Sequence, residues 1–132
     1  MEGLTSIRST FGPKATMDRL EAEIRAHGMN VFDRIDHAAG AAEAGVALRP
    51  TELIIFANAR GGTPLMQSVQ TLGIDLPLKA LVWEDASGTT WLSYNEPSWL
   101  AHRRGVANAA PVVSKMSAAL SAMARKITEN AA

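Results

Sequence analysis

The fold is decided between residues 49 and 94, where two apolar runs enclose a polar stretch: Glu52-Leu53-Ile54-Ile55-Phe56-Ala57-Asn58, then Arg60-Gly61-Gly62-Thr63-Pro64-Leu65-Met66, and later Leu78-Lys79-Ala80-Leu81-Val82-Trp83-Glu84. The first run is apolar without alternation, which is typical of a strand in the middle of a sheet. The two glycines predict a loop, after which Gly62 or Thr63 begins a helix with Pro64 near its first position. The last run predicts a second strand.

The sequence after the second strand predicts a β-hairpin, because Asp85-Ala86-Ser87-Gly88 has turn composition and Thr90-Trp91-Leu92-Ser93-Tyr94 reads as a strand. Upstream, strands are expected over residues 4–10 and 29–35. A helix is expected over residues 16–27, with Thr16 as its N-cap and Gly28 at its end. The alanine-rich residues 37–45 predict a short helix packed closely on another element.

Two further helices are expected, a short one over residues 96–103 and an amphipathic one over about residues 109–130. The apolar stripe of the second comprises Val112, Met116, Leu120, Met123 and Ile127, and it either docks on the domain or contacts a second copy of the chain. The order of elements predicts an α+β fold with one domain over residues 1–132. We expect a two-layer sandwich in which helices cover a mixed sheet of about five strands with a C-terminal β-hairpin.

Composition excludes several functional classes. The 13 Lys and Arg residues balance 13 Asp and Glu residues, so the chain lacks the net positive charge that drives nucleic-acid binding. The chain has no cysteine, which excludes disulfides and thiol catalysis and fits a cytoplasmic location. No apolar block has the length of a signal peptide or a membrane span, so we expect no membrane contact.

A polar cleft near His37 is one candidate site. His37 follows Asp36 and could act as a general base oriented by that carboxylate; alternatively, it is a helix-cap residue satisfied by the backbone. Glu84 and Tyr94 lie on the predicted hairpin and could line the same cleft, or could be a solvent-facing charge and a packing residue. No zinc signature or cofactor motif occurs, so we expect no metal or cofactor.

The stretch after the first apolar run is the second candidate site. Asn58, Arg60, Gly62 and Thr63 stand where a strand ends and a helix begins, a position where α/β proteins often bind anions through backbone N–H groups. The spacing matches no phosphate-binding fingerprint, so a plain turn is the alternative.

Several segments, taken in order, resemble one family, and they are Ile35-Asp36-His37-Ala38-Ala39-Gly40-Ala41, Leu48-Arg49-Pro50-Thr51-Glu52-Leu53-Ile54-Ile55-Phe56, Gly62-Thr63-Pro64-Leu65-Met66, Asp75-Leu76-Pro77-Leu78-Lys79-Ala80-Leu81-Val82-Trp83-Glu84-Asp85 and Trp91-Leu92-Ser93-Tyr94-Asn95-Glu96-Pro97. On these segments residues 16–105 resemble the domain of unknown function 302 family (DUF302), which comprises small bacterial and archaeal α/β domains. The family usually has Gly-Asn-Pro after the central strand, whereas this chain has Ala57-Asn58-Ala59. The resemblance implies a fold and a homodimer, and it implies no activity.

Two functional hypotheses follow. The first is a homodimeric module without catalysis that binds a small molecule, such as an anion, or a protein partner. The second is an enzyme or sensor that acts on a small polar molecule through a cleft lined by His37, Asn58, Thr63 and Glu84. The second hypothesis requires these four side chains to lie within hydrogen-bonding reach of one another.

Overall fold

The structure, a computed structural model, describes residues 1–106 and 110–129. Its centre is a five-stranded sheet with the strand order β1-β5-β4-β3-β2. The strands are β1 (Leu4–Ser9), β2 (Asn30–Asp36), β3 (Thr51–Ala57), β4 (Leu78–Glu84) and β5 (Thr90–Asn95). Every pairing is antiparallel, so the predicted mixed sheet is wrong. The reason is that the chain crosses from one edge of the sheet to the other between β1 and β2, so these two strands do not pair.

The turn between β4 and β5 is organised by one carboxylate. Asp85 accepts hydrogen bonds from the indole Nε1 of Trp91 (2.9 Å) and from the backbone N–H groups of Ser87 and Thr89 (both 3.0 Å). These donors, with Trp91 first, lower the pKa of Asp85 to about 2. The two strands therefore form a hairpin, with Trp83 paired to Trp91. This hairpin joins the last two strands of the described residues, and the two helices expected after it follow.

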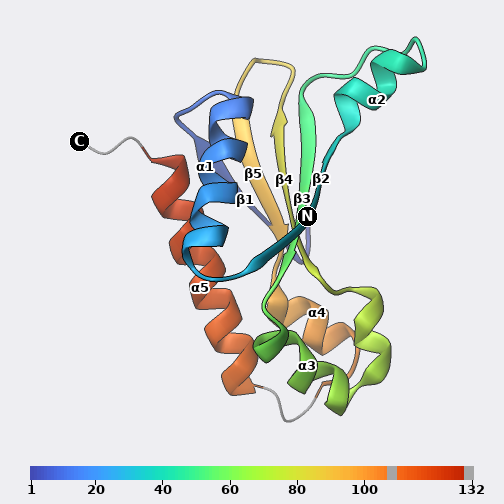
Figure 1. Cartoon of the computed structure of the whole chain (residues 1–132), viewed down its shortest axis with the longest axis vertical. Coiled ribbons are helices and arrows are strands. Elements are labelled where there is room, and N and C mark those ends of the chain that lie inside the picture. The colour runs from blue at the N-terminus through green and yellow to red at the C-terminus, as the bar shows by residue number, and fades with distance from the viewer. Residues whose placement is uncertain (107–109, 130–132) are drawn as a thin grey trace.

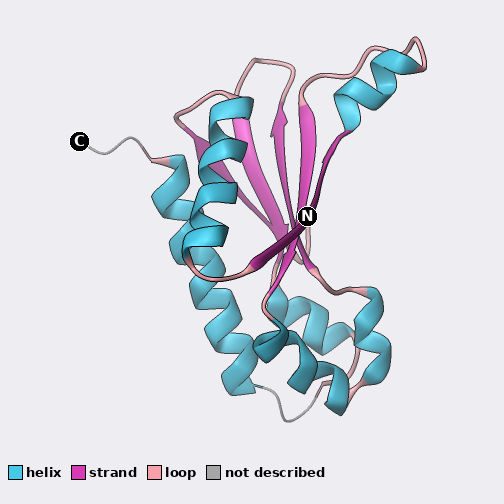
Figure 2. Cartoon of the chain, viewed as in Figure 1, coloured by secondary structure: helices cyan, strands magenta, loops and turns pink. Residues whose placement is uncertain are grey.

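Two helices, α1 (Pro13–Ala26) and α5 (Ala110–Thr128), lie side by side against one face of the sheet (Figure 1). Figure 2 shows the resulting two layers, with the helices on one side of the strands. The main hydrophobic core lies between these layers, and it includes Met17, Leu20, Ile24, Ile54, Phe56, Val82, Leu92, Leu120, Met123 and Ile127. The amphipathic stripe predicted for the last helix therefore docks on its own domain, and Leu120, Met123 and Ile127 are the stripe residues in this core.

Helix α1 begins three residues before the predicted start. Gly12 is the N-cap and Pro13 the first helical residue, a position that favours proline because its fixed φ angle suits the helix. Thr16 is fully buried, and its hydroxyl lies 2.7 Å from the hydroxyl of Ser9 on β1. The hydroxyl thus ties the helix to the sheet instead of capping the helix.

A smaller cluster of helices lies beyond one end of the sheet and contains α3 (Ala59–Ser68), the 3-10 helix η1 (Gln70–Ile74) and α4 (Pro97–Arg103). Its apolar centre is formed by Leu65, Leu72, Ala101 and Val113. Helix α3 starts earlier than predicted, because Asn58 acts as its N-cap and the two glycines are helical. The Asn58 cap and the packing of Leu65 in the smaller cluster together offset the low helix propensity of the two glycines.

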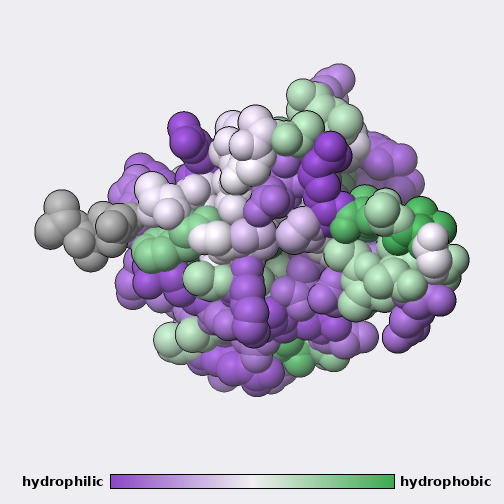
Figure 3. Space-filling view, turned by 90° about the horizontal axis from the view of Figure 1, so that it is seen from above, coloured by the Kyte–Doolittle hydropathy of each residue, from purple (hydrophilic) through white to green (hydrophobic). Residues whose placement is uncertain are grey.

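Helix α2 (His37–Glu43) projects from the opposite end of the molecule, between β2 and β3 (Figure 1). None of its residues is buried, so the predicted close packing of this helix is wrong. The segment after it exposes Val46 (61%) and Leu48 (50%), and Figure 3 shows hydrophobic atoms gathered over this projection at the right.

The face of the sheet opposite α1 and α5 is only partly covered. Its side chains alternate with those of the core and include Leu53, Ile55, Leu81, Trp83 and Trp91, none of which is fully buried. The two tryptophan rings stack, with centroids 6.2 Å apart, and each indole N–H has an acceptor. We call these five residues the outer face.

Candidate functional site

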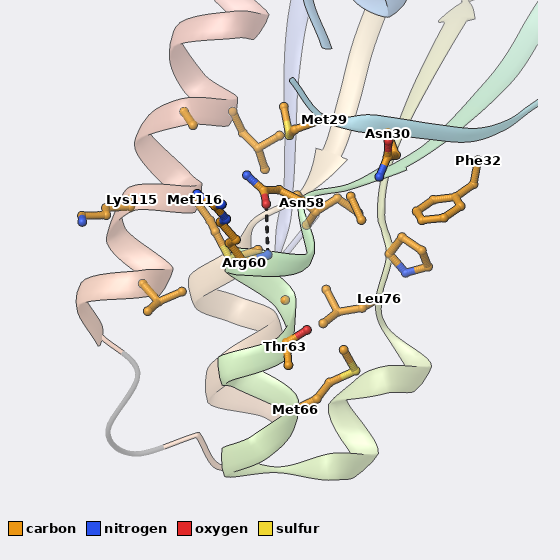
Figure 4. A pocket seen from close by; sticks show the side chains of 18 of the residues that line it. Met29, Asn30, Phe32, Asn58, Arg60, Thr63, Met66, Leu76, Lys115 and Met116 are labelled. Carbon is orange, nitrogen blue, oxygen red and sulfur yellow. Dashed lines mark hydrogen bonds between the residues drawn. The ribbon is translucent and has the colours of Figure 1, made fainter. Parts of the chain in front are cut away.

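A cleft of about 590 Å³ opens where the sheet meets the smaller cluster of helices (Figure 4). It lies between β2, α3, the segment that follows η1, and α5. Its walls are mainly apolar and include Met29, Phe32, Met66, Leu76, Pro77, Leu78, Val112, Met116, Leu120 and Met123. Four of the six methionines of the chain are among them. Methionine side chains are flexible and polarisable, so these walls can adapt to ligands of different shape.

Polar groups reach the cleft at a few positions, namely Asn30, Asn58, Arg60, Thr63 and Lys115. Among the described residues that line the cleft, none is acidic. The same part of the chain provides no carboxylate within 4 Å of either cation, Arg60 or Lys115. Within residues 1–106 and 110–129, the lining of the cleft therefore carries positive charge, and neither cation forms an ion pair.

The start of α3 positions Asn58 and Arg60. Asn58 directly follows β3, and its Oδ1 accepts a hydrogen bond from the backbone N–H of Arg60 at 3.0 Å. The backbone N–H groups of Gly61 and Gly62 donate to the carbonyl oxygen of Asn58 at 2.9 and 3.1 Å. These three amides already have acceptors, so the predicted binding of an anion by free backbone N–H groups of this loop is wrong. An anion here would be bound by side chains.

The structure brings four of the predicted ligand-binding residues together, because Asn58, Arg60, Gly62 and Thr63 all line the cleft. Tyr94 does not. It lies in the main core on β5 with 4% of its surface exposed. Burial raises the pKa of its hydroxyl, and the nearby negative charge of Glu96 raises it further.

The structure places His37 and Glu84 at the other end of the sheet. The backbone N–H of Glu84 donates to Pro50 just before β3, whereas Asn58 follows the last residue of β3. Because a strand of seven residues spans roughly 20 Å, His37 and Glu84 cannot share a cleft with Asn58 and Thr63. The predicted convergence of these four side chains is therefore wrong.

His37 itself is exposed at the first position of α2. The carboxylate of Asp36 caps that helix by accepting from the backbone N–H of Ala39 at 2.9 Å, rather than orienting the imidazole. Among the described residues, no three His, Asp or Glu side chains gather closely enough to hold a metal ion.

Sequence reasoning missed most of the apolar lining. The most exposed example is Phe32, whose side chain is 60% exposed at the rim of the cleft. It lies at a β-bulge, where the pairing of β2 with β3 shifts between Val31 and Asp33. A bulge re-aims a side chain, and the local pattern of residues 29–36 does not reveal it. Met116 and Lys115 could have been predicted as lining residues, since the last helix has a methionine-rich apolar face beside basic residues.

Comparison with curated proteins finds longer relatives. The chain is 50% identical over 113 residues to Fluoride-specific ion channel FluC 1 of Brucella suis biovar 1 (strain 1330), a match that covers 86% of this chain and 44% of the relative. Fluoride-specific ion channel FluC 1 of Brucella abortus biovar 1 (strain 9-941) is also 50% identical over 113 residues, which cover 42% of that protein. The chain thus spans less than half the length of the curated relatives it matches. In the part of the chain that the structure describes, no helix is both long and apolar enough to cross a membrane.

The fold has a close match among solved structures, the crystal structure of an uncharacterized conserved protein DUF302 from Bacillus stearothermophilus. The TM-score is 0.87, and the match covers 98% of this chain and 100% of that chain at 18% sequence identity. This likeness shows a common fold. At the level of sequence, the family model described as Domain of unknown function DUF302 matches residues 5–123, which extends the segment on which the resemblance was based. The chain therefore belongs to the DUF302 family.

Proposed function

We propose that this chain is a binding module for a small molecule and that it works as a homodimer. The cleft carries the proposal. Its volume of about 590 Å³ falls within the range of small-molecule sites, which is roughly 300–1,000 Å³. An apolar wall with a few polar side chains is also the usual composition of such sites.

Apolar contact supplies the affinity in this proposal. A ligand that loses roughly 200 Å² of apolar surface in the cleft gains about 5 kcal/mol before the entropy cost of association is subtracted. Phe32 and Leu76 lie on the side of the cleft away from α5 and Met116 lies on α5 (Figure 4), so the three side chains can contact such a ligand from two sides. The alternative, an enzyme or sensor that uses His37, Asn58 and Glu84, has no such support because these residues lie at opposite ends of β3.

The names of the longer relatives suggest a setting for this module. We propose that a domain of this kind binds a regulatory ligand in such proteins and does not itself conduct fluoride. Fluoride is a small, strongly hydrated anion, so a conducting site must replace its water with many hydrogen-bond donors. The mainly apolar walls of the cleft do not offer such a site.

The ligand-binding proposal is tested by filling the cleft with a larger side chain. Ala119 lies on the exposed side of α5 and lines the cleft, so Ala119→Trp places an indole in the ligand space without disturbing the core. We expect wild-type protein to bind the neutral fluorescent probe Nile red saturably, and the variant to bind it at least about tenfold more weakly. Fluorescence titration measures both constants.

The matched control is Ala118→Trp, which adds the same side chain at the neighbouring exposed position of α5 that does not line the cleft. Both substitutions should leave the free energy of unfolding within about 0.5 kcal/mol of wild type. Equal weakening by the two variants, or a wild-type protein that shows no saturable binding, would refute the proposed site.

The outer face supports the homodimer. This face is apolar and only partly covered, as contact surfaces often are, and its stacked tryptophans have satisfied N–H groups and can be covered at little desolvation cost. In a two-fold dimer with its axis parallel to the strands, β1 of one copy lies over β2 of the other.

The dimer is tested with Leu81→Asp, which places a charge in the middle of the outer face. We expect wild type to sediment as a dimer at tens of micromolar and the variant as a monomer, because burying an unpaired carboxylate costs several kcal/mol. Ala118→Asp on the exposed side of α5 is the control and should remain dimeric. A monomeric wild type, or a variant that stays dimeric, contradicts the proposal.

A further inference from the structure

We infer that the cleft takes an elongated apolar ligand that carries one anionic group, of the kind represented by a medium-chain carboxylate. This inference rests on the proposed function and names the class of ligand. It follows from three features of the cleft, which are the sign of its charges, the orientation of one side-chain amide and the apolar walls beyond these polar groups.

The charges are of one sign. Arg60 and Lys115 are the ionisable side chains that line the described part of the cleft, and both are cationic. In the view of Figure 4, Arg60 of α3 points toward the α5 side of the cleft, while Lys115 points outward from α5. A ligand with an anionic end at this side would meet Arg60 first, and the long side chain of Lys115 can turn toward it.

The side-chain amide of Asn58 adds a donor. A backbone N–H can only donate, so the hydrogen bond from Arg60 at 3.0 Å identifies the capping atom of Asn58 as its oxygen. The Nδ2 group is then the part of this amide that remains for a ligand, and it can only donate. Together with the two cations, it gives the cleft three groups that only donate, while Asn30 and Thr63 can donate as well as accept, so the lining favours an anion over a cation.

The rest of the ligand must be apolar. From this polar side the cleft continues between Met66, Leu76 and Phe32, which Figure 4 shows along the side away from α5. A compact inorganic anion such as phosphate would leave these walls facing water, whereas an alkyl chain would cover them. The arrangement therefore fits an amphipathic anion better than a small ion.

The test compares three ligands with the same alkyl chain: decanoate, decanol and decyltrimethylammonium. Each displaces Nile red from the full chain, all below their aggregation concentrations, first at about 0.01 M ionic strength and then at about 1 M. We expect decanoate to bind about fivefold more tightly than decanol at low salt, and the cationic ligand to bind least tightly. The preference for decanoate should disappear at high salt, because exposed charges are screened there.

The variants assign the preference to residues. The double variant Arg60→Gln with Lys115→Gln should retain Nile red binding but bind decanol at least as tightly as decanoate. Lys14→Gln is the control, since Lys14 is a highly exposed cation in the first turn of α1, far from the cleft, and it should keep the wild-type preference.

Each outcome separates this inference from the proposed function. If Nile red binds in the cleft but wild type prefers decanol or the cationic ligand, the inference about charge is wrong while the binding function stands. An unchanged preference in the double variant also overturns the inference. If the double variant fails to fold, the salt dependence of wild type still decides, because a preference that persists at about 1 M cannot come from these exposed cations.

Discussion

Replacing Phe56 with alanine is expected to lower the free energy of unfolding by about 3–5 kcal/mol. Phe56 is fully buried on the interior strand β3 and packs in the core with residues of α1 and β4. The loss combines the transfer free energy of the ring with the cost of the cavity that it leaves. Domains have total stabilities of about 5–15 kcal/mol, so the variant should lose a large share of its stability. Urea unfolding followed by circular dichroism measures the change.

Phe32→Ala is the matched control, because it removes the same ring from a position that is 60% exposed. Its effect on the free energy of unfolding should be within about 0.5 kcal/mol. Phe32→Ala should weaken ligand binding more than Phe56→Ala does, since Phe32 lines the cleft and Phe56 does not. Equal destabilisation by the two substitutions would show that the assignment of core and rim is wrong.

The second large effect is expected at Arg34, the centre of a charge cluster on β2. Its guanidinium donates to both carboxylate oxygens of Glu52 on β3, at 2.8 and 3.1 Å. It also donates to Asp18 at 3.0 Å and to Glu21 at 3.1 Å, both on α1. Only 24% of the Arg34 side chain is exposed. Arg34→Met should therefore lower the free energy of unfolding by about 1.5–3 kcal/mol at pH 7, because three carboxylates lose their shared cation.

This loss should depend on pH. The hydrogen bond from Arg34 lowers the pKa of Asp18 below 3.8 and that of Glu21 below 4.5, their values in the absence of such a partner. The folded state then binds fewer protons than the unfolded state, so the stabilisation is fully present above these values. It disappears as the pH falls through the lowered values. The difference between wild type and Arg34→Met should thus shrink as the pH falls from 5 toward 2.

The control for Arg34 is Arg25→Met. Arg25 pairs with Glu21 across one turn of α1, at 3.1 Å, but 58% of its side chain is exposed. Exposed pairs of this kind contribute only about 0.3–0.5 kcal/mol. Urea unfolding of both variants at a series of pH values makes the comparison. A loss at Arg34 that is as small as that at Arg25, or one that grows in acid, would contradict the role assigned to the cluster.

Local patterns predicted the regular elements well where periodicity was strong. The unbroken apolar run of β3, the turn composition at Asp85 and the amphipathic stripe of α5 each predicted an element that the structure contains. These signals are local, since a strand, a tight turn or a helix face depends on residues that are neighbours in sequence. Helix starts were predicted less well, because Pro13 and Asn58 set them and the sequence offers Thr16 and Thr63 as competing positions.

The candidate site was only half predictable. Asn58, Arg60, Gly62 and Thr63 are close in sequence, so a local pattern was sufficient to group them. His37 and Glu84 were grouped with that site on chemical type alone, and the antiparallel pairing of β3 and β4 separates them from it.

Composition and short segments are sufficient to assign the family, the α+β class and the polar group at the end of β3. The tertiary structure decided the antiparallel sheet, the exposed position of α2 and the cleft. The walls of the cleft come from residues 29–32, 57–66, 73–78 and 112–123, which are distant in sequence and meet only when α5 docks beside the sheet. Packing between distant segments depends on the crossover between β1 and β2 and on the bulge at Phe32, and no local pattern encodes either.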